Sequence, residues 1–95
     1  MRELILDGLT WEKGDDVYDA FFKAVGAPEW HGRNFDALID SIEKGDINAI
    51  EVPYKLIIKH RDSVGAGAEK TVADFVDLIR EIGARGCPVE IGVEK

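Results

Sequence analysis

Three carboxylates follow one another at helical spacing near the middle of the chain. Asp36, Asp40 and Glu43 occupy positions i, i+4 and i+7, which in a helix places them along one stripe. Neighbouring like charges cost roughly a few tenths of a kcal/mol per pair, and only Asp36 is close enough to a helix start to be compensated by the helix dipole. A stripe that costs stability suits the capture of cationic groups. A solvated helix face is the alternative interpretation.

An aromatic pair, Trp30 and His31, comes shortly before these acids. It lies between Pro28 and Gly32, where the chain is not expected to be helical. Planar side chains on a rigid turn are typical anchors at protein interfaces. We therefore expect the turn and the acidic stripe to serve one binding surface, with Trp30 closing the end of the core as the alternative.

The other candidates for chemistry do not form a catalytic set. Cys87 precedes a proline and a predicted strand, which favours a packed and inert thiol. His31 and His60 have no Cys or His neighbour at the spacing of metal ligands. Ser41 and Ser63 lack the Gly-x-Ser-x-Gly elbow of a nucleophile. We therefore predict a protein without enzymatic activity, metal or cofactor.

The charge of the chain favours one class of partner. Nineteen acidic and 12 basic residues give a formal net charge of −7. This excess disfavours nucleic acid and anionic membranes, whereas it attracts basic proteins and speeds their association. Solubility alone is the alternative reason for the acidity.

Length and composition indicate one domain, residues 1–95. The chain has 95 residues, of which 45% are hydrophobic and 33% charged, enough for one core. A single cysteine cannot form an internal disulfide, so a reducing compartment is the simplest interpretation. Neither a leader sequence nor an apolar run of roughly 18 residues is present. We expect a soluble, cytoplasmic protein.

The first third of the chain predicts a strand and a helix. Residues 2–7 alternate charged and apolar side chains, a pattern typical of a short strand, which we expect to be largely buried. Asp15 and Asp16 can cap the helix that follows, in which apolar residues recur every three or four positions. This helix is expected to end at Gly26.

A second helix is expected to carry the acids. Asn34 is a good N-cap residue, and Lys44 marks the end. The acidic stripe runs beside the apolar stripe of this helix rather than opposite it. The apolar stripe consists of Phe35, Leu38, Ile39 and Ile42.

The centre of the chain predicts a second strand. Residues 54–59 are rich in branched apolar side chains. Residues 47–52 are either an extended lead-in or part of the same strand. Residues 60–67 contain glycines and are expected to form a loop or a very short helix.

The last third predicts a long helix and a final strand. The helix covers about residues 68–84, with Gly83 and Gly86 at its end, and the strand covers residues 89–94. Strands separated by helices favour a parallel sheet. The predicted fold class is therefore α/β, with a three-stranded parallel sheet packed with three to four helices.

Residues 28–40, with the sequence PEWHGRNFDALID, resemble the signature of the barstar family. The shared pattern is a proline, an acid, two aromatic or similar residues, a glycine, an asparagine, and then Asp-Ala-Leu followed by a further Asp. Arg80-Glu81 and Gly86-Cys87 resemble the family's last helix and the turn after it. Barstar-like proteins are small intracellular inhibitors of ribonucleases, and the resemblance implies their three-stranded parallel α/β fold.

The resemblance also implies roles for individual residues. The second helix and the turn before it would enter the active site of a ribonuclease, where Asp40 would take the place of the substrate phosphate. Asp36, Trp30 and Asn34 would lie beside it. Glu81 would make a peripheral contact from the last helix. The predicted partner-binding residues are Trp30, His31, Gly32, Asn34, Asp36, Ile39, Asp40, Glu43 and Glu81.

Three departures from the family pattern touch the expected interface. His31 replaces the second aromatic residue, Ile39 stands where tryptophan is frequent, and Arg85 stands where an acid can occur. The target is therefore expected to be a different ribonuclease or another class of toxin. We predict a cytoplasmic inhibitor, monomeric when free, that binds a basic ribonuclease one to one. The alternative is an acidic module of the same fold that binds a partner other than a ribonuclease.

Overall fold

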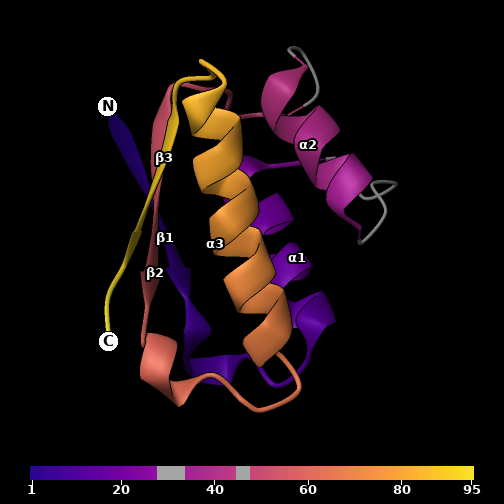
Figure 1. Ribbon diagram of the computed structural model, residues 1–95, viewed down its shortest axis with the longest axis vertical. Helices are drawn as coiled ribbons and strands as arrows, with labels where there is room; N and C mark the ends of the chain where they lie inside the picture. The colour runs from indigo at the N-terminus through magenta and orange to yellow at the C-terminus, as the bar shows by residue number, and fades with distance from the viewer. Residues whose placement is uncertain (28–33, 45–47) are drawn as a thin grey trace.

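Three strands and the helices that cover one of their faces make up the described part of the chain (Figure 1). The computed structural model describes residues 1–27, 34–44 and 48–95. In chain order the elements are β1 (Arg2–Asp7), the 3-10 helix η1 (Gly8–Thr10), α1 (Gly14–Val25), α2 (Phe35–Glu43), β2 (Tyr54–Lys59), the 3-10 helix η2 (Arg61–Ser63), α3 (Glu69–Ala84) and β3 (Val89–Val93).

The sheet is parallel throughout, as the alternation of strands and helices predicted. Strand β2 lies in the centre and pairs with β1 on one side and β3 on the other. Leu56 is in register with Leu4 of β1 and with Ile91 of β3. The predicted fold class, α/β with a three-stranded parallel sheet, is confirmed.

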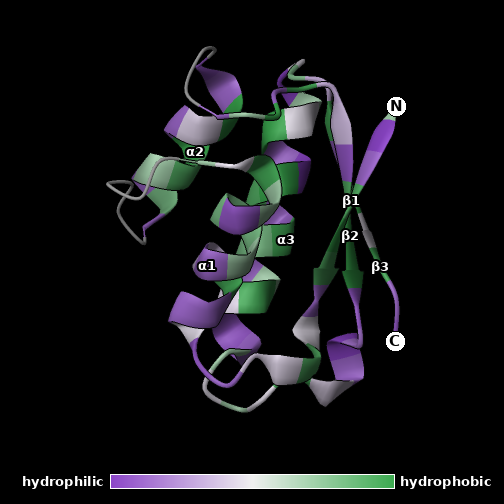
Figure 2. Cartoon of the chain, turned by 180° about the vertical axis from the view of Figure 1, so that it is seen from behind, coloured by the Kyte–Doolittle hydropathy of each residue, from purple (hydrophilic) through white to green (hydrophobic). Residues whose placement is uncertain are grey.

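The molecule has three layers. Helices α1 and α3 lie against one face of the sheet, and α2 lies beyond them, farthest from the strands (Figures 1 and 2). The inner face of β2 is fully covered, since Tyr54, Leu56 and Ile58 are each 0% exposed. Phe21 of α1 and Phe75 of α3 join the two middle helices, with ring centroids 5.7 Å apart. Helix α2 therefore forms the outer layer, and its residues Leu38 and Ile42 complete the core from that side.

The expectation that residues 2–7 are largely buried was wrong. Leu6 is the one residue of β1 that is buried, and Ile5 is 49% exposed. The physical reason is that the described helices cover a single face of the sheet, and β1 is an edge strand. Successive side chains of a strand point to opposite faces, so every second residue of β1 faces outward.

Helix α1 begins slightly earlier than predicted, and its capping differs. Lys13, rather than an aspartate, occupies the N-cap position. Asp16 supports the start from inside the first turn, because its Oδ2 accepts hydrogen bonds from the backbone N–H groups of Glu12 at 2.9 Å and Lys13 at 3.1 Å. The predicted end at Gly26 is confirmed, with this residue in the left-handed conformation at φ 69°.

The other differences concern the segments around β2 and the end of α3. Residues 48–52 form no part of β2, and η2 supplies the very short helix expected within 60–67. The predicted end of α3 at Ala84 is confirmed, and Gly83 lies in its last turn. A Cβ at Gly83 would lie 2.8 Å from the carbonyl oxygen of Val89, so this glycine permits close packing of α3 against β3. The helix ends before Gly86, which has φ 103°.

Candidate functional site

Helix α2 starts where the sequence predicted. The Oδ1 of Asn34 accepts a hydrogen bond from the backbone N–H of Ala37 at 2.8 Å, which caps one of the free N–H groups at the start of the helix. The helix then runs for nine residues. Asn34 itself is exposed, so it can hold the helix start and remain accessible.

The apolar stripe of α2 divides into an anchor and a rim. Leu38 and Ile42 are the anchor, because they are 0% and 1% exposed and belong to the main core. Phe35 and Ile39 form the rim and are half-buried. The ring of Phe35 lies 5.7 Å from the ring of Tyr18 on α1. The anchor fixes the helix, while the rim remains partly available to a partner.

The three acids that we call the α2 acidic edge, Asp36, Asp40 and Glu43, are all exposed beside this rim. The spacing predicted this placement. Two of them have a cation nearby, which the sequence reasoning missed. Lys44 Nζ lies 3.7 Å from Asp40 Oδ1, and Arg85 Nη2 lies 3.3 Å from Glu43 Oε1. The repulsion along the edge is thus partly offset, by exposed pairs that each contribute at most about 1 kcal/mol.

A polar tie fixes the C-terminal half of α2. Ser41 is 0% exposed, and Asn48 Nδ2 donates to both its carbonyl oxygen and its hydroxyl oxygen at 2.7 Å. The backbone N–H of Asn48 donates to Glu51 Oε1 at 2.7 Å. This tie was not predicted. The sequence does contain an indication of it. Ser41 follows Leu38 by three residues and so falls on the buried side of the helix, where a hydroxyl needs a hydrogen-bond partner.

Glu81 is exposed on α3, one turn before Arg85. Residues four apart lie on the same face of a helix, and Arg85 reaches across to Glu43 of α2. Glu81 therefore lies on the side of α3 that faces the C-terminal end of α2. Trp30, His31 and Gly32, the remaining predicted partner-binding residues, lie outside the described residues. The partner-binding roles of all nine residues stay predictions.

Comparison with known proteins identifies the family of the chain. Residues 1–94 match the family model described as "Barstar (barnase inhibitor)". The chain belongs to the barstar family. It is also 26% identical over 81 residues, 85% of each chain, to a Bacillus subtilis (strain 168) protein named "Putative ribonuclease inhibitor YrdF". The resemblance found in the sequence is thereby confirmed.

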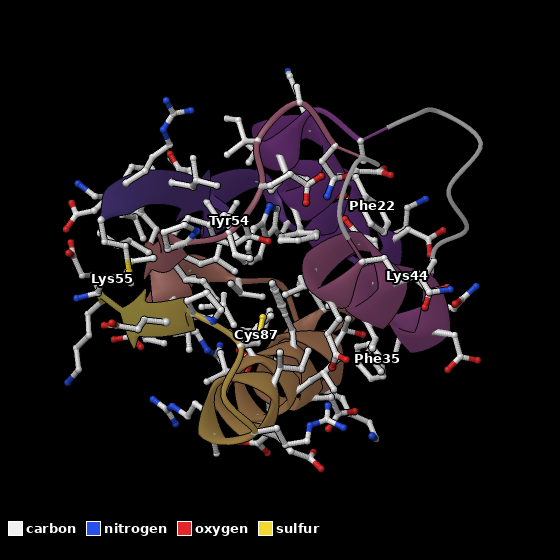
Figure 3. The ribbon with its side chains drawn as sticks, turned by 90° about the horizontal axis from the view of Figure 1, so that it is seen from above. Phe22, Phe35, Lys44, Tyr54, Lys55 and Cys87 are labelled. Carbon is white, nitrogen blue, oxygen red and sulfur yellow. The ribbon has the colours of Figure 1, made fainter. Side chains whose placement is uncertain are left out.

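This barstar-family chain has a hollow between the C-terminal ends of α2 and α3. Its volume is about 340 Å³, and its lining consists of Glu43, Val52, Ile82, Arg85, Cys87 and Pro88. Figure 3 shows Cys87 where the chain passes from α3 to the sheet. Burial raises the pKa of the Cys87 thiol, and the nearby charge of Glu43 raises this pKa further. The thiol is therefore held protonated, in agreement with the predicted inert cysteine.

Tyr54 is a second group whose proton is firmly held. Its side chain is 0% exposed, and its hydroxyl is buried with no hydrogen-bond partner among the described residues. Burial is the main reason that its pKa is raised, with smaller contributions from Cys87 and Glu51. Neither Tyr54 nor Cys87 is thus suited to act as a nucleophile near neutral pH.

The remaining histidine among the described residues of this barstar-family chain is His60. His60 follows the C-terminal end of β2, whereas Cys87 lies before the N-terminal end of β3. The Nδ1 of His60 is 2.8 Å from Asp7 Oδ1. Within residues 1–27, 34–44 and 48–95, no group of three or more His, Cys, Asp or Glu side chains is placed to hold a metal ion. Among the helices described, none has the length and apolar character that a membrane crossing requires.

Proposed function

We propose that this protein is an intracellular inhibitor of a basic ribonuclease, and that it blocks the active site with α2 and the turn before it. In this proposal the carboxylates of the α2 acidic edge occupy positions that the substrate phosphates would take. The free protein is monomeric and binds its target one to one.

The observation that carries the proposal is the placement of α2. It is the outermost layer of the described structure (Figure 1), and Leu38 and Ile42 fix it to the core. Its acids are exposed beside a half-buried apolar rim. A rigid element that presents charges next to apolar surface is suited to enter a concave site on another protein.

The chemistry of a carboxylate supports phosphate mimicry. An ionised carboxylate offers two acceptor oxygens to arginine or lysine, and arginine binds carboxylate and phosphate through the same paired geometry. An enzyme that holds RNA phosphates with cationic side chains would therefore also hold Asp36 and Asp40. Family membership and the name of the Bacillus relative support the same class of partner.

Net charge supports fast capture. The formal charge of −7 attracts a basic protein over distances comparable to the screening length, about 8 Å at physiological ionic strength. The attraction raises the association rate, and added salt weakens it.

We also infer that the protein has no turnover of its own. The Cys87 thiol is held protonated. The imidazole of His60 lies at the opposite end of the strands, beside Asp7. A nucleophile and a base within hydrogen-bond reach are needed for covalent hydrolysis. These two groups are not in reach of each other.

The test is a titration of basic ribonucleases with the purified protein. We expect one ribonuclease class to be inhibited at a one-to-one ratio, with an association rate that falls as salt is raised. Tight binding to a basic protein without loss of its ribonuclease activity would favour the non-ribonuclease module. An association rate that stays constant from low to high salt would contradict the role of charge.

A further inference from the structure

The ion pair between Glu43 and Arg85 lines the hollow between the ends of α2 and α3. The two residues are 42 positions apart in the chain. Both are substantially exposed, 41% for Glu43 and 55% for Arg85. A pair that is this exposed is weak and exchanges readily with other charged groups. Glu43 is therefore available to a competing cation.

The other lining residues give the hollow uncharged walls. Val52 and Pro88 present apolar surface, Ile82 lies fully buried beneath them, and the thiol of Cys87 is uncharged because its pKa is raised. Among the described lining residues, Glu43 carries the negative charge and Arg85 the positive charge. The hollow thus combines polar surface and a smaller apolar part with one carboxylate, Glu43, which is already paired with Arg85.

Its size and chemistry fit one kind of occupant. A volume of about 340 Å³ corresponds to roughly ten water molecules at about 30 Å³ each, enough for a long side chain. Arginine and lysine place an aliphatic stem along apolar surface and a cation at the tip. A net charge of −7 favours a cationic occupant over an anionic one.

We propose that this hollow receives an arginine or lysine side chain of the bound protein, which displaces Arg85 from Glu43. Arg85 is then an internal competitor that lowers affinity and restricts binding to partners with a cation at this position. The identity of the partner rests on the proposed function, whereas the existence of a site for a basic side chain does not.

The first test compares two arginines of α3. Arg85→Gln removes the competitor, and Arg80→Gln removes the same charge from an exposed position five residues away. Relative to Arg80→Gln, we expect Arg85→Gln to tighten ribonuclease binding by roughly two- to fivefold, the range of an exposed ion pair. Equal affinities, or weaker binding by Arg85→Gln, would overturn the proposal and leave Arg85 as a clamp on α2.

The second test needs no ribonuclease. Arginine amide is titrated into the isotope-labelled protein while the backbone amides of Val52, Ile82 and Cys87 are followed by NMR. We expect saturable shifts in the parent, tighter binding in Arg85→Gln and no binding in Glu43→Gln. Citrulline amide, which has the same shape without the charge, should leave these signals unmoved.

The two tests separate the two claims. Inhibition of a ribonuclease together with an unresponsive hollow would retain the proposed function and overturn this inference. If the hollow binds arginine amide but the protein inhibits no ribonuclease, this inference would be retained and the proposed function would be overturned. Shifts of equal size with citrulline amide would show that Glu43 is not the recognition group, and they would also overturn the inference.

Discussion

Two exposed surfaces of the molecule carry acidic residues, and they arrange them differently. On the uncovered face of the sheet, the register places Lys55 between Glu3 of β1 and Glu90 of β3, and Lys55 extends away from the helices (Figure 3). Acid, base and acid therefore alternate across the strands. On the other side of the molecule, the α2 acidic edge places three acids in one row.

In the proposed function, it is the arrangement of the acids rather than their number that makes the α2 acidic edge the binding surface. Neighbouring opposite charges on a sheet stabilise each other, so the row through Lys55 needs no external cation. Like charges in a row on a helix repel each other, and the exposed cations near them, Lys44 and Arg85, offset this only weakly. In the proposed function, a basic partner relieves the remaining repulsion among these three acids.

The largest expected effect is on binding, when one acid is removed from each surface. Asp40→Ala should weaken ribonuclease binding by roughly 2–5 kcal/mol, because the cations of the partner would be left buried and unpaired. Glu90→Ala removes the same charge from the uncovered face of the sheet and should change affinity by less than about 0.5 kcal/mol. Inhibition titrations of both variants provide the measurement. Equal losses would show that net charge, not position, determines affinity.

A similar effect is expected on stability, when one apolar residue is shortened on each surface. Leu38→Ala should destabilise the protein by about 2–5 kcal/mol, because Leu38 is fully buried beneath α2. Ile5→Ala, at a residue 49% exposed on the sheet, should cost much less. Urea unfolding gives both free energies. A small loss for Leu38→Ala would mean that α2 is not anchored to the core.

A smaller loss is expected from the polar tie behind the acidic edge. Asn48→Ala removes both hydrogen bonds to Ser41 and leaves a buried hydroxyl without its donor, at a cost of about 1–3 kcal/mol. The association rate should stay unchanged, since the charge of the edge is unaltered, while dissociation becomes faster. Unfolding and binding kinetics measured on the same variant check this. A slower association with normal dissociation would be the contrary result.

The smallest effect concerns pH, at the end of the sheet opposite the hollow. A hydrogen bond from the backbone N–H of Leu9, and then the contact with His60, lower the pKa of Asp7 from 3.8. A lowered folded-state pKa stabilises the protein above the unfolded value, and this contribution is lost as pH falls through the folded value. Asp7→Asn should therefore lower the unfolding midpoint at pH 7 and have little effect near pH 2. If the difference in unfolding midpoint between Asp7→Asn and the parent grew as the pH fell, the pKa of Asp7 would be raised in the folded protein and not lowered.

The sequence predicted the elements that depend on local pattern. Apolar periodicity located α1, α2 and α3, and strand–helix alternation indicated a parallel sheet. The N-cap at Asn34 and the side-by-side stripes of α2 were predicted for the same reason, because both depend on neighbours within one helix.

Features that depend on contacts between separate segments were missed. The pairing of Glu43 with Arg85 depends on how α2 packs beside the end of α3, which helical spacing does not encode. The tie between Ser41 and Asn48 spans only seven positions, but it joins α2 to a residue outside any helix, so the periodicity of α2 does not encode it either. The close approach of Gly83 to Val89 exists only after β3 has packed against α3, so the sequence pattern does not predict it. The exposure of Ile5 followed from a sheet with one uncovered face. The alternation of charged and apolar residues in β1 was compatible with that outcome.

The central claim is that the α2 acidic edge takes the place of substrate phosphate in a ribonuclease. Steady-state inhibition at a series of RNA substrate concentrations tests it most directly. If the inhibitor and the RNA compete for one site, the inhibitor concentration that halves the rate should rise linearly with the RNA concentration. A mononucleotide that occupies the active site should likewise slow formation of the complex. Inhibition that is unaffected by saturating substrate would place the contact outside the active site and contradict phosphate mimicry.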